Sequence, residues 1–138
     1  MRSLALGVLI VVSVVACSGP QFRSFSTTLL NPVEPHLTVV FRDATGLVTA
    51  IGPAAVADAG QPMLLADPSD SKAFVITWLG GVCEQDVGLE FRVQESGYRL
   101  TLAVHKGNSC PMLGLFRGVR VVTSAPIPLG SIEVIGRA

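Results

Sequence analysis

The sequence predicts an all-β domain, an antiparallel β-sandwich or small barrel of about seven strands. Segments with β-branched or alternating character recur between turn signals over residues 36–138, and this pattern is typical of short strands. No segment keeps a helical period of 3.6 residues, and no internal repeat is visible. Strands without long helices bury their apolar faces by packing sheet on sheet or by closing into a barrel.

The candidate strands are separated by turn residues and by one long connection. Residues 43–46 (Asp-Ala-Thr-Gly) predict a turn, and residues 52–70 predict an irregular connection rich in Ala, Gly, Pro and Asp. That connection holds either a short strand at Met63–Ala66 or a helical turn at Ala54–Ala57. The segment 73–79 is apolar at both alternating positions, which predicts a central strand. The seven candidate strands are residues 37–42, 47–51, 73–79, 87–93, 98–104, 119–123 and 132–135.

One hairpin can be predicted pair by pair. If Ser96 and Gly97 are the central turn residues, the residue numbers of each opposed pair sum to 193. Three apolar pairs then share one face. A slip of one residue would mix polar and apolar faces, which a half-buried sheet resists. The predicted apolar pairs are Val93 with Leu100, Phe91 with Leu102, and Leu89 with Val104.

The first 16 residues have the character of an export signal. Arg2 precedes an apolar run of 13 residues, Leu4–Ala16, whereas a membrane-spanning helix needs about 20 and a signal peptide about 7–15. The run ends in Val14-Val15-Ala16-Cys17, which resembles the lipobox of bacterial lipoproteins. That resemblance implies cleavage before Cys17 and a diacylglyceryl group on its thiol. An ordinary signal peptide with an incidental cysteine is the alternative.

This leader sets the expected domain organisation and compartment. We expect a signal-peptide helix over residues 1–16, a flexible lipidated tether over 17–35 and the β domain over 36–138. Two or more acyl chains hold a protein firmly on a membrane, so the domain is expected in the cell envelope. Ser18, where aspartate would resemble an inner-membrane retention signal, favours the periplasmic face of the outer membrane, or the cell surface. Four tether residues are apolar enough for part of the tether to dock on the domain: Phe22, Phe25, Leu29 and Leu30.

The other two cysteines predict a disulfide. The residue numbers of Cys83 and Cys110 also sum to 193. The predicted hairpin register, extended outward, therefore sets the two cysteines opposite each other. With Cys17 acylated, these two thiols remain, and paired cysteines normally oxidise outside the cytoplasm. A redox pair or a metal site is the alternative, but Cys-x-x-Cys spacing is absent and His105 is the one nearby histidine.

The mature part carries a looser resemblance. Trp78-x-Gly80-Gly81-x-Cys83, then Cys110 and Arg117-x-Val119-Arg120-Val121-Val122, is similar to small secreted β-sandwich domains of uncharacterised bacterial lipoproteins. The resemblance implies no activity. Trp78 is predicted to pack in the core against the disulfide.

The candidate catalytic groups are sparse. Ser109 and His105, with Glu84 or Asp86 to orient the histidine, are the one arrangement that can be drawn, and no Gly-x-Ser-x-Gly segment occurs. We predict that His36 and His105 are surface or strand-end residues, and that Glu84 and Asp86 lie in a solvated loop. Residues 67–71 (Asp-Pro-Ser-Asp-Ser) predict a turn with side-chain caps. No catalytic, metal-binding or cofactor-binding residue is predicted.

Charge and composition narrow the function classes. After removal of residues 1–16 the chain has 9 basic and 10 acidic residues, so neither a nucleic-acid footprint nor a polybasic membrane patch is expected. The sequence favours a non-enzymatic, membrane-anchored module that binds an unknown protein or small molecule. The alternatives are a small periplasmic hydrolase or inhibitor acting through the loops around Cys83 and Cys110, and a structural subunit of an envelope complex.

Overall fold

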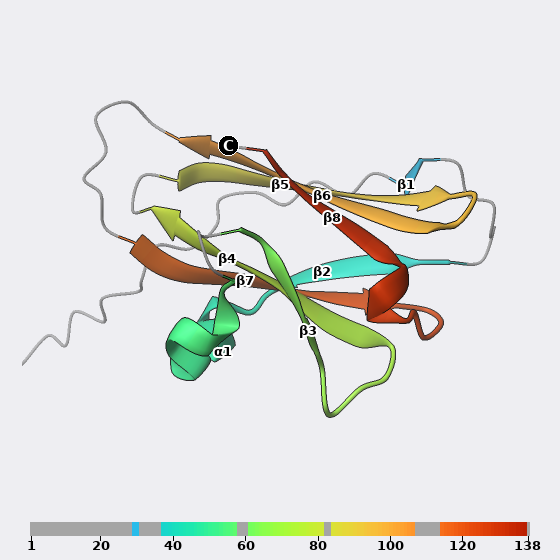
Figure 1. Cartoon of the computed structure of the whole chain (residues 1–138), viewed down its shortest axis with the longest axis horizontal. Coiled ribbons are helices and arrows are strands. Elements are labelled where there is room, and N and C mark those ends of the chain that lie inside the picture. Colours follow the sequence, from blue (N-terminus) through green and yellow to red (C-terminus); the bar gives the residue numbers. More distant parts are fainter. Residues whose placement is uncertain (1–28, 31–36, 58–60, 82–83, 107–113, 138) are drawn as a thin grey trace, which may run out of the picture.

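The computed structural model describes residues 29–30, 37–57, 61–81, 84–106 and 114–137. These residues are mostly β, with one short α-helix, α1 (Thr45–Ile51), and the 3-10 turns η1 (Gly52–Ala55) and η3 (Leu129–Ser131). Figure 1 shows the strands, which are β1 (Leu29–Leu30), β2 (Val39–Asp43), β3 (Met63–Ala66), β4 (Ala73–Gly81), β5 (Glu84–Gln94), β6 (Gly97–Lys106), β7 (Gly114–Thr123) and β8 (Ile132–Arg137).

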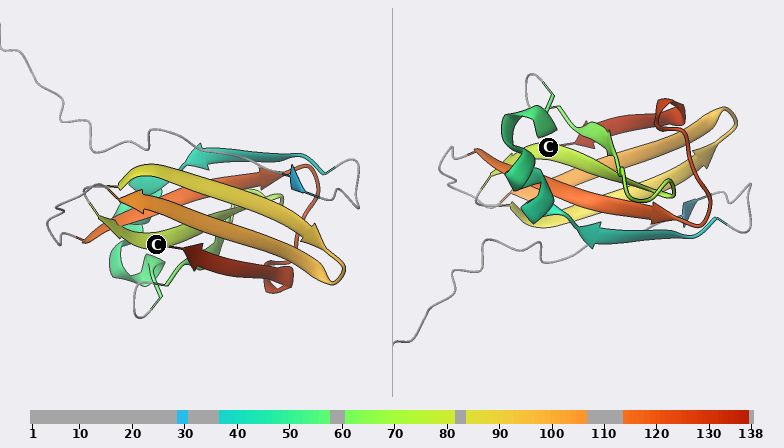
Figure 2. Two further views of the ribbon diagram at one scale, coloured as in Figure 1. Left: turned by 90° about the horizontal axis from the view of Figure 1, so that it is seen from above. Right: turned by 90° about the horizontal axis from the view of Figure 1, so that it is seen from below.

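The strands form two four-stranded sheets. Sheet A has the order β1-β5-β6-β8, and sheet B has the order β2-β7-β4-β3. The sheets lie one over the other (Figure 1). Seen from above and from below, β1 and β2 follow the same long side of the molecule (Figure 2).

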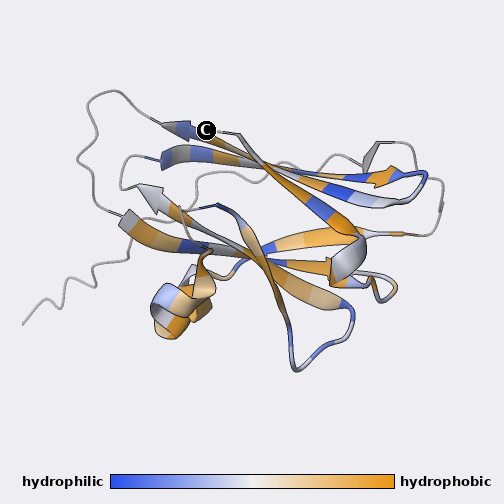
Figure 3. Cartoon of the chain, in the orientation of Figure 1, coloured by the Kyte–Doolittle hydropathy of each residue, from blue (hydrophilic) through white to orange (hydrophobic). Residues whose placement is uncertain are grey.

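The main core lies between the sheets. Inward side chains of β4 and β7 meet inward side chains of β5 and β6. Hydrophobic and hydrophilic residues alternate along β5 and β6 (Figure 3). The core is made mainly of Phe74, Ile76, Trp78, Val87, Leu89, Phe91, Leu100, Leu102, Val119 and Val121. Trp78 is 3% exposed, which confirms its predicted core position.

Sheet B is also covered on its outer face. The helix α1 and the turn η1 lie there, and Val48, Ala55 and Val75 form a second small core with Ala44. The buried Thr77 hydroxyl donates to the Ala55 carbonyl. Strand β4 is therefore buried on both faces between β7 and β3, as its two-sided apolar pattern predicted.

Six of the seven candidate strands are present, and the candidate strand at residues 47–51 is wrong. Residues 45–51 form α1 where a turn and a returning strand were expected. Burial of Val48, which is 0% exposed, outweighs the β preference of this short segment. The Asp43 carboxylate accepts from the Thr45 amide at 2.8 Å, and Gly52, at φ 72°, followed by Pro53 ends the helix. Of the two alternatives expected for the connection after α1, the structure contains the short strand Met63–Ala66, and the 3-10 turn η1 ends at Ala55.

The expectation of a wholly antiparallel arrangement is wrong at two strand pairs. β1 pairs with β5 in parallel, and β6 pairs with β8 in parallel. The chain leaves β6, passes through β7 in the other sheet, and returns as β8. A crossover of this length permits parallel pairing, whereas a tight hairpin forces antiparallel pairing.

The predicted hairpin register is also wrong. Gln94 lies opposite Gly97 and Phe91 opposite Leu100, so opposed positions sum to 191 instead of 193. A shift of two residues keeps every side chain on its face, so the apolar pattern could not exclude it. Gly97 begins β6, and an added Cβ there would lie 2.5 Å from the carbonyl oxygen of Ser131. This glycine is thus required by the close approach of the chain before β8.

Several predictions fall outside the described residues. These are the signal peptide, most of the tether, His36, Ser109 and the three cysteines. Leu29 and Leu30, which the sequence places in the tether, pair with β5. Within the described part of the chain, no helix is both long enough and apolar enough to cross a membrane.

Candidate functional site

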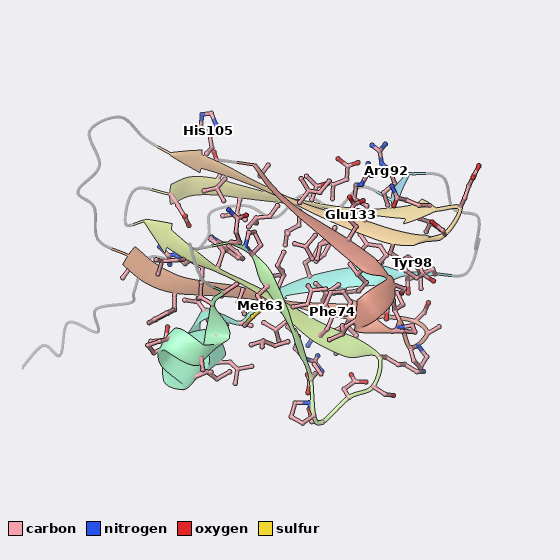
Figure 4. The ribbon with its side chains drawn as sticks, viewed as in Figure 1. Met63, Phe74, Arg92, Tyr98, His105 and Glu133 are labelled. Carbon is pink, nitrogen blue, oxygen red and sulfur yellow. The ribbon has the colours of Figure 1, made fainter. Side chains whose placement is uncertain are left out.

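The outer face of sheet A is a row of polar and charged side chains. Arg92 pairs with Glu90 at 2.6 Å, and Arg99 pairs with Glu133 at 2.8 Å. All four side chains are at least about one third exposed, so each pair contributes little to stability. Figure 4 shows Arg92, Glu133 and His105 on this side of the molecule.

His105 is an exposed residue near the end of β6, as predicted. Its position in the strand pairing is opposite Asp86 of β5. Glu84, the other proposed orienting group, is not beside it, because its side chain is buried. Ser109, the nucleophile of the arrangement drawn from the sequence, lies outside the described residues.

A buried ion pair joins the two sheets at one end. Arg117 of β7 has its Nε 3.6 Å from Oε2 of Glu84 of β5, and both side chains are 2% exposed. Oε1 of Glu84 accepts from the Gly81 amide at 3.0 Å, and Nη2 of Arg117 donates to the Gly81 carbonyl at 3.4 Å. The prediction that Glu84 lies in a solvated loop is wrong, whereas Asp86 is exposed.

A β-bulge turns Glu84 inward. The pairing of β5 with β6 shifts between Glu84 and Asp86, and an extra residue in one strand reverses the face on which the preceding side chains lie. The inward residues of β5 have odd numbers from Val87 onward. Without the bulge Glu84 would point to solvent. With the bulge it points between the sheets, toward Arg117.

Gly80 supplies the space for this pair. It occupies an inward position of β4, two residues after Trp78, and it is buried. A Cβ built on Gly80 would lie 2.5 Å from both carboxylate oxygens of Glu84 and 2.7 Å from Cγ of Arg117. The three residues therefore form one unit, which we call the interior ion-pair cluster (Gly80, Glu84 and Arg117).

A second polar cluster lies at the turn between β3 and β4. Oδ1 of Asp67 accepts from the Ser69 amide at 2.9 Å and from its hydroxyl at 2.6 Å, which confirms the predicted capped turn. Nε of Arg120 donates to Asp67 at 2.7 Å, and its Nη2 donates to Asp70 at 3.1 Å. The Ser69 hydroxyl, the Arg120 guanidinium and the Ser69 amide, in that order, lower the pKa of Asp67 from 3.8 to about 2.

The outer face of sheet B carries exposed apolar side chains, and we call it the α1 face. Val40 points outward from β2, Leu79 points outward from β4, and Leu47 and Ile51 lie on α1. Each is between 44% and 53% exposed. Of the described residues, these four are the large hydrophobic side chains classed as exposed, and all lie on this one face. The α1 face thus combines these exposed apolar side chains with the ion pairs of Arg120, whereas the described part of the outer face of sheet A has no exposed large apolar side chain.

The comparisons with known proteins give no family for this chain. The sequence matches no protein family and no curated protein, and the chain matches no solved structure. Among the described residues, no group of three or more His, Cys, Asp or Glu side chains is placed to hold a metal ion.

Two features of these sites could not be found in the sequence. No residue type in the sequence marks the bulge at Glu84. The alternation of inward and outward positions, counted from the apolar residues of β5, therefore gives the wrong face for Glu84. Arg120 and Asp67 are 53 residues apart in the sequence. A contact between residues so far apart in the sequence depends on the strand order of sheet B. The capped turn was predictable, because Asp and Ser two residues apart bond locally.

Proposed function

We propose that this chain is a lipid-anchored lipoprotein of the cell envelope whose folded part is a β-sandwich that binds a partner without catalysing a reaction. The observation that carries the proposal is the run of 13 apolar residues that ends in Val14-Val15-Ala16-Cys17. Its length suits a removable signal and is too short for a membrane span. Acylation of Cys17 would attach the domain stably to a membrane.

The arrangement of the two sheets supports the β-sandwich. Their facing sides share one apolar core, and each sheet presents its other side outward. Sheet-on-sheet packing of this kind is a common scaffold for surface modules whose function lies in a face or in loops.

The α1 face favours a second candidate function, a structural subunit of an envelope complex. Exposed apolar side chains gathered on one face indicate an interaction site more strongly than the same residues scattered singly. The opposite face carries surface ion pairs, which suit contact with water. We infer that a protein partner in such a complex would bind the α1 face.

Mass spectrometry of the chain produced in a bacterium tests the anchor. We expect loss of residues 1–16 and an acylated Cys17, with the protein in the membrane fraction. The variant Cys17→Ser is the matched control and should lose both the acyl groups and the membrane association. A chain that keeps Met1, or that is cleaved but carries no acyl group, would contradict the proposal.

The partner proposal is tested by the size of the detergent-solubilised complex. The double variant Leu47→Glu/Ile51→Glu should reduce this size to that of the free chain. Ala103→Glu places one glutamate on the outer face of sheet A, where residue 103 is exposed, and should leave the complex intact. A free chain in every sample would exclude the structural-subunit function. Hydrolysis by the purified protein that His105→Ala abolishes would instead favour the hydrolase alternative.

A further inference from the structure

An exposed arginine without an acidic partner lies within the α1 face. Val39 and Phe41 of β2 pack toward the main core, so Val40 and Arg42 alternate onto the outer face of sheet B. Arg42 is exposed. Among the residues that the structure describes, no carboxylate forms an ion pair with its guanidinium.

The strand register places Arg42 between the apolar groups of this face. Arg42 lies opposite Arg120 of β7. Two residues before Arg120, Gly118 lies under α1, because an added Cβ there would collide with Val48. Val40 is two residues before Arg42 in β2, so Arg42 lies between Val40 and the helix with its exposed side chains. A partner that covers both Val40 and α1 therefore also covers Arg42.

The neighbouring arginine is compensated by acids on the other side of its strand. Arg120 donates to Asp67 at 2.7 Å and to Asp70 at 3.1 Å. Both acids lie at the turn between β3 and β4, and β7 separates β4 from β2. The carboxylate of Asp43 caps the start of α1. Like charges opposite each other on neighbouring strands are unfavourable, and these acids compensate Arg120 and leave Arg42 uncompensated.

We propose that the protein partner of the α1 face presents a carboxylate, flanked by apolar side chains, that pairs with Arg42. The inference rests on the proposed structural-subunit function and names the chemistry of its partner. A charge that is removed from water at an interface needs an opposite charge and hydrogen bonds. A carboxylate matches the forked donors of a guanidinium. The adjoining residues 44–57 contain no charged side chain, so they suit apolar groups on either side of that carboxylate.

The other charges of the α1 face favour a protein carboxylate over a lipid surface. Anionic lipids attract clusters of lysine and arginine. Here Asp67 and Asp70 share the face with Arg120, and lipid phosphates would repel both acids. A single carboxylate placed at Arg42 avoids this repulsion, because both acids lie on the far side of β7.

A zero-length cross-link tests for the carboxylate. Carbodiimide joins an amine to a carboxylate that it contacts, and it does not join a guanidinium, so Arg42→Lys makes the proposed contact reactive. We expect carbodiimide treatment of membranes from cells that encode this variant to join position 42 to an Asp or Glu of another protein, detected by peptide mass spectrometry. Ala103→Lys, on the outer face of sheet A, is the matched control and should give no such product.

Dissociation of the detergent-solubilised complex measures the effect of the charge. Arg42→Gln should make dissociation at least about tenfold faster, because truncation of a buried charge pair acts mainly on the dissociation rate. Arg92→Gln removes an arginine from the outer face of sheet A and should leave the rate unchanged. Urea unfolding should be the same for Arg42→Gln and the native chain, since Arg42 is an exposed residue.

The outcomes separate this proposal from the function on which it rests. A complex that Leu47→Glu/Ile51→Glu disrupts, but that Arg42→Gln leaves unchanged and that gives no cross-link at position 42, would overturn the carboxylate alone. Absence of any complex would overturn both. A cross-link to a second copy of this chain would overturn the proposal. Binding of the native chain to protein-free vesicles of phosphatidylethanolamine and phosphatidylglycerol, lost in Leu47→Glu/Ile51→Glu, would also overturn it.

Discussion

Glu84 and Arg117 belong to different sheets and meet in the space between them, with 3.6 Å between the nearest charged atoms. Each charge is removed from water and is compensated by the other and by the backbone of Gly81. Such a pair costs desolvation free energy when it forms, and breaking it leaves one charge buried alone. It therefore restricts how the two sheets can be placed against each other.

Removal of either charge should destabilise the domain strongly. We expect Glu84→Gln and Arg117→Met each to lower the free energy of unfolding by about 3–5 kcal/mol, measured by urea unfolding. Glu90→Gln, which removes an exposed pair with Arg92, should cost less than about 1 kcal/mol. The double variant Glu84→Gln/Arg117→Met should be less unstable than the sum of the single variants. Additive losses would show that the two side chains do not interact.

The space at Gly80 should be essential to the same cluster. Gly80→Ala would bring a methyl group within 2.5 Å of the Glu84 carboxylate, and we expect a loss of about 1–3 kcal/mol, typical of overpacking. Gly81→Ala is the matched control, since an added Cβ there meets no atom within 4 Å. Equal stability of the two variants would mean that the cluster can shift without cost.

The position of α1 should depend on Gly118. A Cβ at Gly118 would collide with Val48, so Gly118→Ala should lift the helix and cost about 1–3 kcal/mol. Val48→Ala removes the colliding atoms and should cost less in the Gly118→Ala chain than in the native chain. This coupling is measured by a double-mutant cycle of unfolding free energies. Independent effects would contradict the contact between the helix and the sheet.

The turn between β3 and β4 should make stability depend on acid. The pKa of Asp67 is about 2 in the folded chain and 3.8 ordinarily, so its ionised form is favoured by folding. Its contribution is complete above about pH 4 and is lost as the pH falls toward 2. Ser69→Ala should raise the pKa of Asp67 toward 3.8, measured by carboxyl NMR titration, and should reduce this loss. Ser71→Ala, in the same turn, should leave the titration unchanged.

The pairing of Cys83 with Cys110 stays a prediction. The register that set them opposite each other is wrong by two residues, so the prediction now depends on the expected compartment alone. Thiol counting on the exported, denatured protein should find no free thiol. Reduction should lower the free energy of unfolding by about 2–5 kcal/mol. Two free thiols would exclude the disulfide.

The sequence predicted those features of the fold that repeat locally. Alternation identified six strands, and two-sided burial identified β4 as central, because each depends on the residues of one segment. The hairpin register failed because a shift by two residues preserves every face. The helix α1 was not predicted because it depends on a contact between Val48 and Gly118, which is distant in the sequence. The interior ion-pair cluster was not predicted for a related reason. It depends on a β-bulge in β5 and on the packing of one sheet against the other.

The central place of β7 in sheet B determines when that sheet can form. β7 pairs with β2 on one side and with β4 on the other, although β2 ends at Asp43 and β7 begins only at Gly114. Among the described strands β2 pairs with β7 alone, so this pairing cannot form until the segment after residue 113 has left the ribosome. Pairings between such distant segments form slowly. A nascent chain of this kind stays open for longer, which would suit the export that we propose for this chain.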